Sequence, residues 1–173
     1  PNLQAVVRWD SRKECESVSL VATVECGLVA NEKAGFKSAA DLIAAAKAAP
    51  GKIDYSSGGP GSPQHLAMAM FASAAGISLT HVPYKGATQA ATDVAAGQIP
   101  VAFQGLGTVA ALVRGGQLTL IGVTTAQRLA QFPDVPTVPD SGLPGFFFTS
   151  RFAILAPPTT PKHLTARPTA EAP

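Results

Sequence analysis

Short apolar runs alternate along this chain with longer segments in which apolar residues recur at helical spacing. The β-prone runs lie at Ile53–Ser56, Ile77–Val82, Ile99–Phe103 and Leu118–Thr124. Helical spacing follows the first three runs, beginning near Pro63 and covering Ala87–Ala96 and Thr108–Arg114. A strand, a loop and a helix thus follow each other three times. This order is typical of a parallel sheet with helices packed on its faces.

Local signals mark where two of the helices begin and end. Ser38 followed by Asp41 is a variant of the capping box and predicts a helix start. That helix is expected to stop before Gly51, which follows a proline. Pro63 suits a first helical turn, and Gly76 suits the position just after a last turn.

The two ends of the chain depart from this pattern. Val18–Ala30 is rich in Val, Leu and Thr and predicts one long strand or two, and Phe146–Ala156 is a second apolar, β-prone run. Four prolines interrupt Ala126–Gly145, which we expect to be an ordered connector. Residues 1–17 are mixed and polar without a clear period, so we expect a loose start.

Composition narrows the class of protein. Apolar residues make up 46% of the 173 residues, which is enough for one good core. A net charge of +2 without a basic cluster argues against nucleic acid as a partner. No apolar run reaches the 18 or so residues that span a bilayer. The cysteines and histidines show no metal-ligand spacing, so we expect no metal and no cofactor.

A glycine-rich loop within Asp54–Leu66 is the first candidate for binding chemistry. It joins a short strand to a helix start, so several backbone N–H groups and the positive end of a helix point into one space. We place Ser57, Gly58, Gly61 and Ser62 among the candidate ligand-binding residues of an anion site, most simply a carboxylate site. The alternative is an ordinary glycine turn that binds nothing, as in many α/β proteins.

Known nucleotide and hydrolase motifs do not account for this loop. A dinucleotide fingerprint that starts at Gly59 needs glycine where Gln64 stands. A nucleophile elbow around Ser62 needs glycine at the same position. A phosphate-binding P-loop needs a Gly-Lys-Ser/Thr sequence, which the chain lacks.

Three glycine-containing loops leave the carboxyl ends of predicted strands, where ligands bind in open parallel sheets. These loops cover Ser57–Ser62, Tyr84–Ala87 and Gln104–Thr108. The second and third loops add the candidate ligand-binding residues Tyr84, Lys85, Gly86 and Gln104. Convergence of the three loops strengthens the prediction of an anion site.

Simpler roles stand beside these assignments. Tyr84 could pack, Lys85 could be a solvated lysine and Gln104 could cap a helix. His65, in the first turn of its helix, could bond only to backbone, and His81 could be a satisfied core or edge histidine. The acids show no pairing and no nucleophile stands beside a base, so we expect no enzyme.

The three loops together carry a resemblance to a known family. The segments are Lys52–Leu66 (KIDYSSGGPGSPQHL), His81–Gly86 (HVPYKG), Phe132–Thr137 (FPDVPT) and Ser141–Gly145 (SGLPG), with Asp41–Gly51 (DLIAAAKAAPG) ahead of them. In order and spacing they resemble the substrate-binding proteins of tripartite tricarboxylate transporters, the Bug or TctC family. The resemblance covers roughly residues 18–162.

This resemblance implies a periplasmic receptor with an α/β fold like that of type II periplasmic binding proteins. Family members have two α/β domains around a cleft, capture small organic acids and pass them to membrane permease subunits. Gly61 and Ser62 would bind a carboxylate through N–H and hydroxyl groups, and Tyr84, Lys85 and Gly86 would line the cleft.

The chain also departs from the family pattern. We expect the family's long N-terminal portion and most of its C-terminal portion to have no counterpart in this sequence. We therefore expect one parallel-sheet domain over residues 18–156, with hinge strands near 18–30 and 146–156 and remnants of a second domain at 1–17 and 157–173. Such a chain would hold half a binding site. The alternatives are a remnant that does not bind, or an α/β enzyme acting on a small anionic substrate.

Overall fold

The computed structural model describes residues 15–165, which fall into two compact units. The larger unit is Glu25–Thr149. The smaller unit contains, among the described residues, 15–24 and 150–165.

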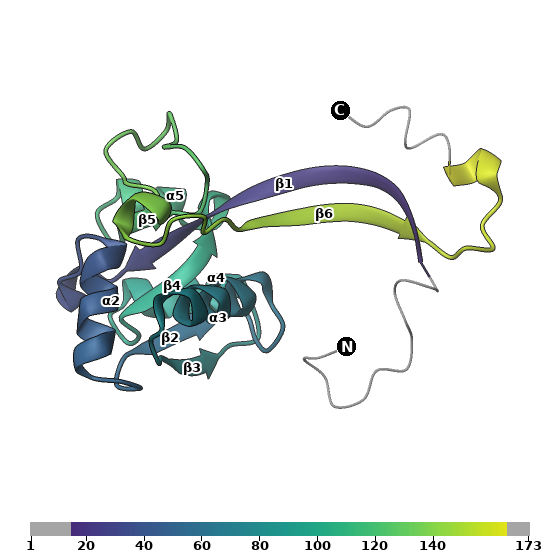
Figure 1. Ribbon diagram of the computed structural model, residues 1–173. Helices are drawn as coiled ribbons and strands as arrows, with labels where there is room; N and C mark the ends of the chain where they lie inside the picture. The colour runs from purple at the N-terminus through teal and green to yellow at the C-terminus, as the bar shows by residue number, and fades with distance from the viewer. Residues whose placement is uncertain (1–14, 166–173) are drawn as a thin grey trace. The chain divides into compact units, whose positions relative to one another are not determined.

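The predicted elements are present, with boundaries that shift by a few residues (Figure 1). The strands are β1 (Glu16–Ala30), β2 (Asp54–Ser57), β3 (Thr80–Pro83), β4 (Val101–Gly105), β5 (Thr119–Val123) and β6 (Thr149–Ala156). The helices are α2 (Ala39–Ala48), α3 (Pro63–Ala75), α4 (Ala87–Ala95) and α5 (Leu106–Arg114), with short 3-10 turns η1 (Glu32–Ala34) and η2 (Pro139–Ser141). Val18–Ala30 therefore belongs to one long strand rather than two.

The sheet of the larger unit has the order β3-β2-β4-β1-β5. Strands β3, β2 and β4 are parallel neighbours, as predicted. Strand β1, predicted as a hinge strand, is antiparallel to both β4 and β5, so the complete sheet is mixed. Leu28 of β1 pairs with Phe103 of β4 on one side and with Gly122 of β5 on the other.

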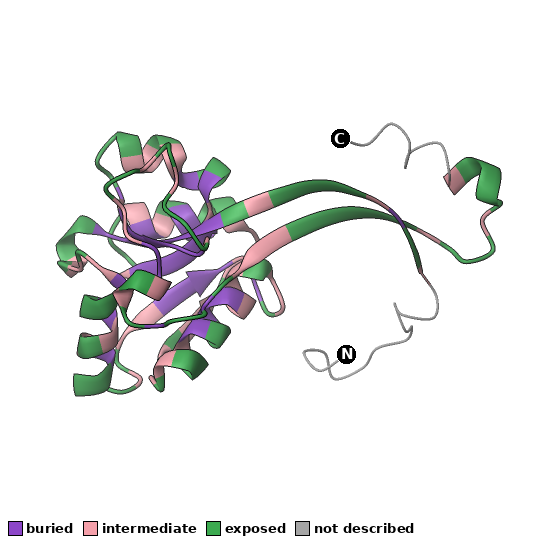
Figure 2. Cartoon of the chain, turned by 45° about the horizontal axis from the view of Figure 1, so that its top comes forward, coloured by how far each residue is buried: buried purple, intermediate pink, exposed green. Residues whose placement is uncertain are grey.

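Helices cover both faces of this sheet, which confirms the predicted layered α/β architecture. One core contains α2 and α3 side chains packed on Phe103 of β4. The other contains α4 and α5 side chains packed on Ala102, the preceding residue of the same strand. Neighbouring strand residues point to opposite faces, so β1, β4 and β5 each contribute to both cores. The buried surfaces lie on the sheet and on the inner sides of the helices (Figure 2).

The predicted helix ends are confirmed at atomic level. The Asp41 N–H donates to Ser38 Oγ at 3.2 Å, and Asp41 Oδ2 accepts from the Lys37 and Ser38 N–H groups at 2.9 Å each. These hydrogen bonds hold the pKa of Asp41 below its usual value. Gly76 ends α3 in the left-handed region at φ 62°.

The smaller unit is built on the pairing of β6 with β1. Large apolar side chains on these strands are exposed: Leu20, Val21, Phe152, Ile154 and Leu155. The domain division expected from the sequence stays a prediction. Within residues 15–165, no helix combines the length and apolarity needed to cross a bilayer.

Candidate functional site

The loop between β2 and α3, residues 58–62, is a tight turn at the carboxyl end of the sheet. Ser57 ends β2 fully buried, and its Oγ accepts the Gly59 N–H at 3.1 Å. Gly59 and Gly61 have φ values of 114° and 79°, a region that favours glycine. Ser62 is the N-cap of α3, with Oγ accepting the His65 N–H at 3.3 Å, and Pro63 takes the first helical position.

Two of the predicted donors already have partners inside this loop. The Gly61 N–H donates to His65 Nδ1 at 3.0 Å, and the Ser62 N–H donates to the Gly59 carbonyl at 3.1 Å. The Ser62 hydroxyl accepts a hydrogen bond and still has its own proton to donate. A ligand carboxylate would therefore meet the Ser62 hydroxyl directly, and would reach the Gly61 N–H only by sharing it with His65.

The glycines of this loop bring it against the start of α4. A Cβ atom on Gly58 would lie 3.2 Å from the Ala87 nitrogen, and one on Gly59 would lie 3.1 Å from the Tyr84 carbonyl oxygen. The Tyr84 N–H donates to the Ser57 carbonyl at 2.9 Å. The first and second predicted loops are thus in direct contact, which confirms that they converge.

We predict that Gly59→Ala lowers the free energy of unfolding by about 1–3 kcal/mol, because it combines backbone strain with a contact to the Tyr84 carbonyl. Gly142→Ala is the matched control, since Gly142 has a similar φ of 103° but a Cβ atom there would have no neighbour within 4 Å. Urea unfolding of both variants measures the difference. Equal losses would show that the close approach contributes nothing.

The second loop places its three candidates differently. Lys85 is exposed and Gly86 is half-buried. A hydrogen bond from the Tyr84 hydroxyl to the Asp93 carboxylate raises the pKa of Tyr84. The Tyr84 hydroxyl therefore interacts with Asp93 of α4.

Gln104 on β4 is the most unusual residue of the site. Its side chain is fully buried, and neither Nε2 nor Oε1 has a hydrogen-bond partner among the described residues. Because Ser56 pairs with Ala102, Gln104 stands level with Gly58 at the carboxyl ends of the strands. A buried amide without hydrogen-bond partners lowers the stability of the folded state by about 1–3 kcal/mol. The Gln104 amide can therefore still donate and accept hydrogen bonds.

Two helix N-termini lie at the same edge without a side-chain cap. Gly86 is the N-cap of α4 and Gly105 the N-cap of α5, and neither glycine can offer a capping side chain. Helix N-termini attract negative charge through their exposed N–H groups. The edge therefore combines uncapped helices, a buried unpartnered amide and the Ser62 hydroxyl, which suits an anionic ligand.

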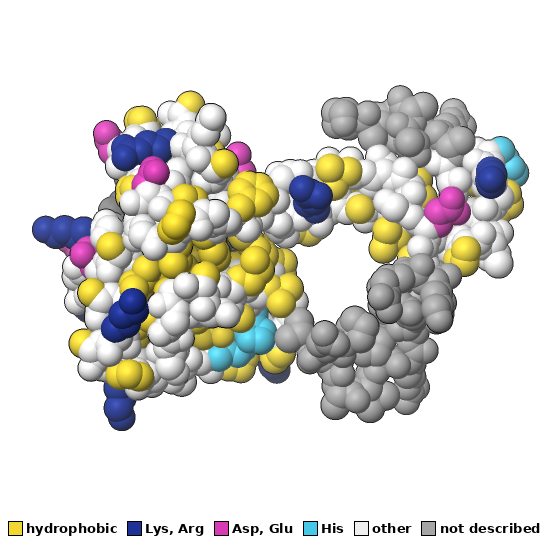
Figure 3. All heavy atoms as spheres, in the orientation of Figure 1, with side chains coloured by type: hydrophobic (Ala, Val, Ile, Leu, Met, Phe, Trp, Pro, Cys, Tyr) yellow, Lys and Arg dark blue, Asp and Glu magenta, His cyan; other side chains and the backbone are white. Residues whose placement is uncertain are grey.

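Two histidines that the sequence left with modest roles border the loop. His65 bonds to backbone as anticipated, and His81 lies on the edge strand β3 with Nε2 at 2.6 Å from Ser57 Oγ. Figure 3 shows histidine side chains together at the surface of the larger unit (cyan). Burial and the neighbouring His65 lower the pKa of His81. The sequence signal that could have linked them to the site is that both lie in the segments Lys52–Leu66 and His81–Gly86, which carry the predicted loops.

The Ser57–His81 contact has the spacing of a nucleophile and its base. Ser57 is fully buried, however, and its hydroxyl also contacts the Gly59 N–H and carbonyl. These contacts engage the Ser57 hydroxyl within the protein in the described conformation. Among residues 15–165, no group of three or more His, Cys, Asp or Glu could hold a metal ion.

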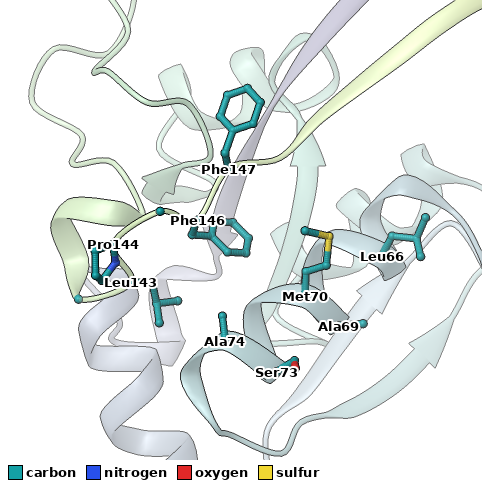
Figure 4. Close-up of a pocket in the computed structure, with 11 residues that line it drawn as sticks. Leu66, Ala69, Met70, Ser73, Ala74, Leu143, Pro144, Phe146 and Phe147 are labelled. Atoms are coloured by element: carbon teal, nitrogen blue, oxygen red, sulfur yellow. The ribbon is translucent and has the colours of Figure 1, made fainter.

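An apolar groove that the sequence did not predict lies beside α3. It has a volume of about 820 Å³ and is lined mainly by Leu66, Met70, Leu143, Phe146 and Phe147. Met70 and Phe146 approach each other from its two sides (Figure 4). Its side chains are apolar except for Ser73, so the groove does not suit a carboxylate and is separate from the predicted residues.

Comparisons with known proteins agree on one family. The profile of the tripartite tricarboxylate transporter family receptor matches residues 1–170. A UPF0065 protein from the tcbD-tcbE intergenic region of a Pseudomonas species is 33% identical over 166 residues, which is 95% of this chain and 49% of that protein.

Solved structures show the same fold. Rpa4515 of R. palustris with adipate superposes with a TM-score of 0.87 at 28% identity, over 95% of this chain and 55% of that one. The periplasmic binding protein BugD gives 0.79 at 27% identity, over 87% and 50%. The chain spans about half the length of the relatives it matches.

Proposed function

The chain belongs to the tripartite tricarboxylate transporter receptor family, and from this premise we propose that it binds a small organic carboxylate in the periplasm for delivery to membrane permease subunits. The permease partners and the periplasmic location rest on the family alone. The ligand class also has support from the described residues.

The main support for a carboxylate ligand is that three loops meet at one edge of the sheet. Gly58 touches the start of α4, and Gln104 stands level with it on the next strand. The uncapped starts of α4 and α5 add positive potential there. A carboxylate matches this set of donors, and adipate is bound by the related Rpa4515.

A thermal-shift screen of the full chain against di- and tricarboxylates tests this proposal. Adipate, malate and citrate are the probes, with glucose and sulfate as controls. A ligand at 100 times its dissociation constant stabilises the native state by about 2.7 kcal/mol, which corresponds to a rise in Tm of roughly 5–10 °C for a chain of this size. A cooperative melt that no carboxylate shifts would contradict the proposal.

We predict that Gly61→Val with Ser62→Ala abolishes this shift, because valine blocks the backbone approach and alanine removes the hydroxyl donor. Loss of one charge-assisted hydrogen bond costs about 1.5–3 kcal/mol, or roughly 10- to 100-fold in affinity. Gly35→Val with Ser73→Ala is the control, since Gly35 has a similar φ of 72° and both residues lie away from the loop. Unchanged binding in the loop variant would remove these two residues from the site.

A further inference from the structure

The two histidine rings that border the β2–α3 loop form a stack attached to that loop at two points. The His65 and His81 ring centroids are 4.2 Å apart and the ring planes differ by 4°. Tyr55 stacks on His81 at 5.0 Å. The attachments are the Gly61 N–H donated to His65 Nδ1 at 3.0 Å and the 2.6 Å contact between Ser57 Oγ and His81 Nε2.

The first attachment exists only for an unprotonated His65 Nδ1. A nitrogen that accepts the Gly61 N–H carries no proton, so His65 is neutral with its proton on Nε2. A proton added at Nδ1 would place two N–H groups against each other 3.0 Å apart and break the bond. Protonation of both rings would bring two positive charges together, with ring centroids 4.2 Å apart.

We propose that His65 and His81 are positioning residues, which hold the β2–α3 loop in its ligand-binding form while both rings are neutral, so that carboxylate affinity falls in mildly acidic solution. This inference rests on the proposed function, because it assigns a regulation to the same loop. It predicts the opposite of simple charge attraction, which would strengthen carboxylate binding as the rings become positive.

The surroundings of the stack contain few other groups that titrate. On the elements packed against His81, β2 carries Asp54 and Tyr55, and α3 carries only His65. Burial raises the pKa of Tyr55, so the phenol stays neutral in this range. Asp54 pairs with Thr80 at the far end of β2 from Ser57. Tyr84 and Lys85 follow β3 in the next loop, and neither has a hydrogen bond to His81 among the described contacts.

The stability of the chain should follow the same titration. Because the pKa of His81 is lowered, the folded state binds fewer protons there than the unfolded chain. The contribution to stability is therefore complete above the usual histidine value of about 6.5 and is lost as the pH falls through the lowered value. Tm should drop between pH 7 and pH 5, and less so in His81→Gln.

The loop-holding role is tested without any ligand by NMR of the full, 15N-labelled chain. The 15N shift of His65 Nδ1 should report an unprotonated acceptor at pH 7.5, and the Gly61 amide resonance should shift in acid as its hydrogen bond to His65 breaks. His65→Asn, whose Oδ1 can accept the same N–H, should abolish the titration of Gly61. His163→Gln, in the smaller unit, is the matched control. A Gly61 resonance that ignores pH while the rings titrate would overturn the role.

The effect on binding is tested by calorimetry with adipate and malate at pH 7.5, 6.5 and 5.5. Affinity should be highest at pH 7.5 and weaken by up to about tenfold per pH unit once the stack takes up a proton. His65→Asn with His81→Gln should bind at pH 7.5 and lose the pH dependence, whereas His65→Leu should bind poorly at every pH. Affinity that rises in acid, or a pH profile that the double variant keeps, would overturn the inference. If neither acid binds at any pH, the proposed function fails, while the Gly61 titration still decides the loop-holding role.

Discussion

Gln104→Met is expected to raise the free energy of unfolding by about 1–3 kcal/mol while weakening carboxylate binding. The side chain is fully buried, and both of its polar atoms lack partners in the described part of the chain. Methionine has nearly the same length and shape but no amide to desolvate, so the penalty disappears. The amide is then absent when a ligand needs a donor, which should lower affinity roughly 10- to 100-fold if the bond is charge-assisted.

Urea unfolding without ligand, and thermal shifts with adipate, separate the two effects. Gln98→Met is the control, because Gln98 is exposed beyond the end of α4 and should change neither quantity. A stabilised variant with unaltered binding would assign Gln104 to packing alone. A destabilised variant would mean that the amide is satisfied in solution, contrary to the described structure.

The largest loss of stability is expected for Phe71→Ala, about 3–5 kcal/mol. Phe71 of α3 is fully buried and meets Phe103 of β4 edge-on, with ring centroids 5.7 Å apart. It meets Phe146 in the same way at 6.0 Å. Alanine would leave a cavity between a helix, the sheet and the segment after η2, so three parts of the larger unit would lose contacts together.

Met70→Ala is the matched control for this prediction, since Met70 is the preceding residue on α3 and 48% exposed. Thermal unfolding of both variants measures the contrast. A loss of 3–5 kcal/mol lowers Tm by roughly 6–20 °C in a chain of this size. Similar midpoints for the two variants would mean that the aromatic cluster does not hold the larger unit together.

Local patterns predicted most of the elements because their causes are local. Capping by Ser38 and Asp41 and the left-handed turn at Gly76 depend on neighbouring residues only, and both are confirmed. The start of α5 lies two residues earlier than predicted, at Leu106, because Gly105 can already act as its N-cap.

The antiparallel insertion of β1 had no such local cause. Its partners are residues 101–105 and 119–123, far along the chain, and the run Val18–Ala30 carries no signal of direction. The same limit applies to the site. Glycine loops at strand ends predicted where it lies, whereas the bond from Gly61 to His65 and that from Tyr84 to Asp93 depend on side-chain orientations that appear only once the loops have met.

Because β1 lies between β4 and β5 in the sheet, its position also determines when the larger unit can fold during synthesis. Strand β1 leaves the ribosome before either of its partners in the larger unit, and the last of these, β5, ends at residue 123. At 5–20 residues per second, the chain needs about 5–20 s to extend from residue 30 to residue 123. Leu28 and its apolar neighbours have no strand of the larger unit to pair with until β4 is complete, and their second neighbour β5 follows only after that. The core of the larger unit therefore closes late, and chaperones that hold unfolded chains have time to engage this segment first.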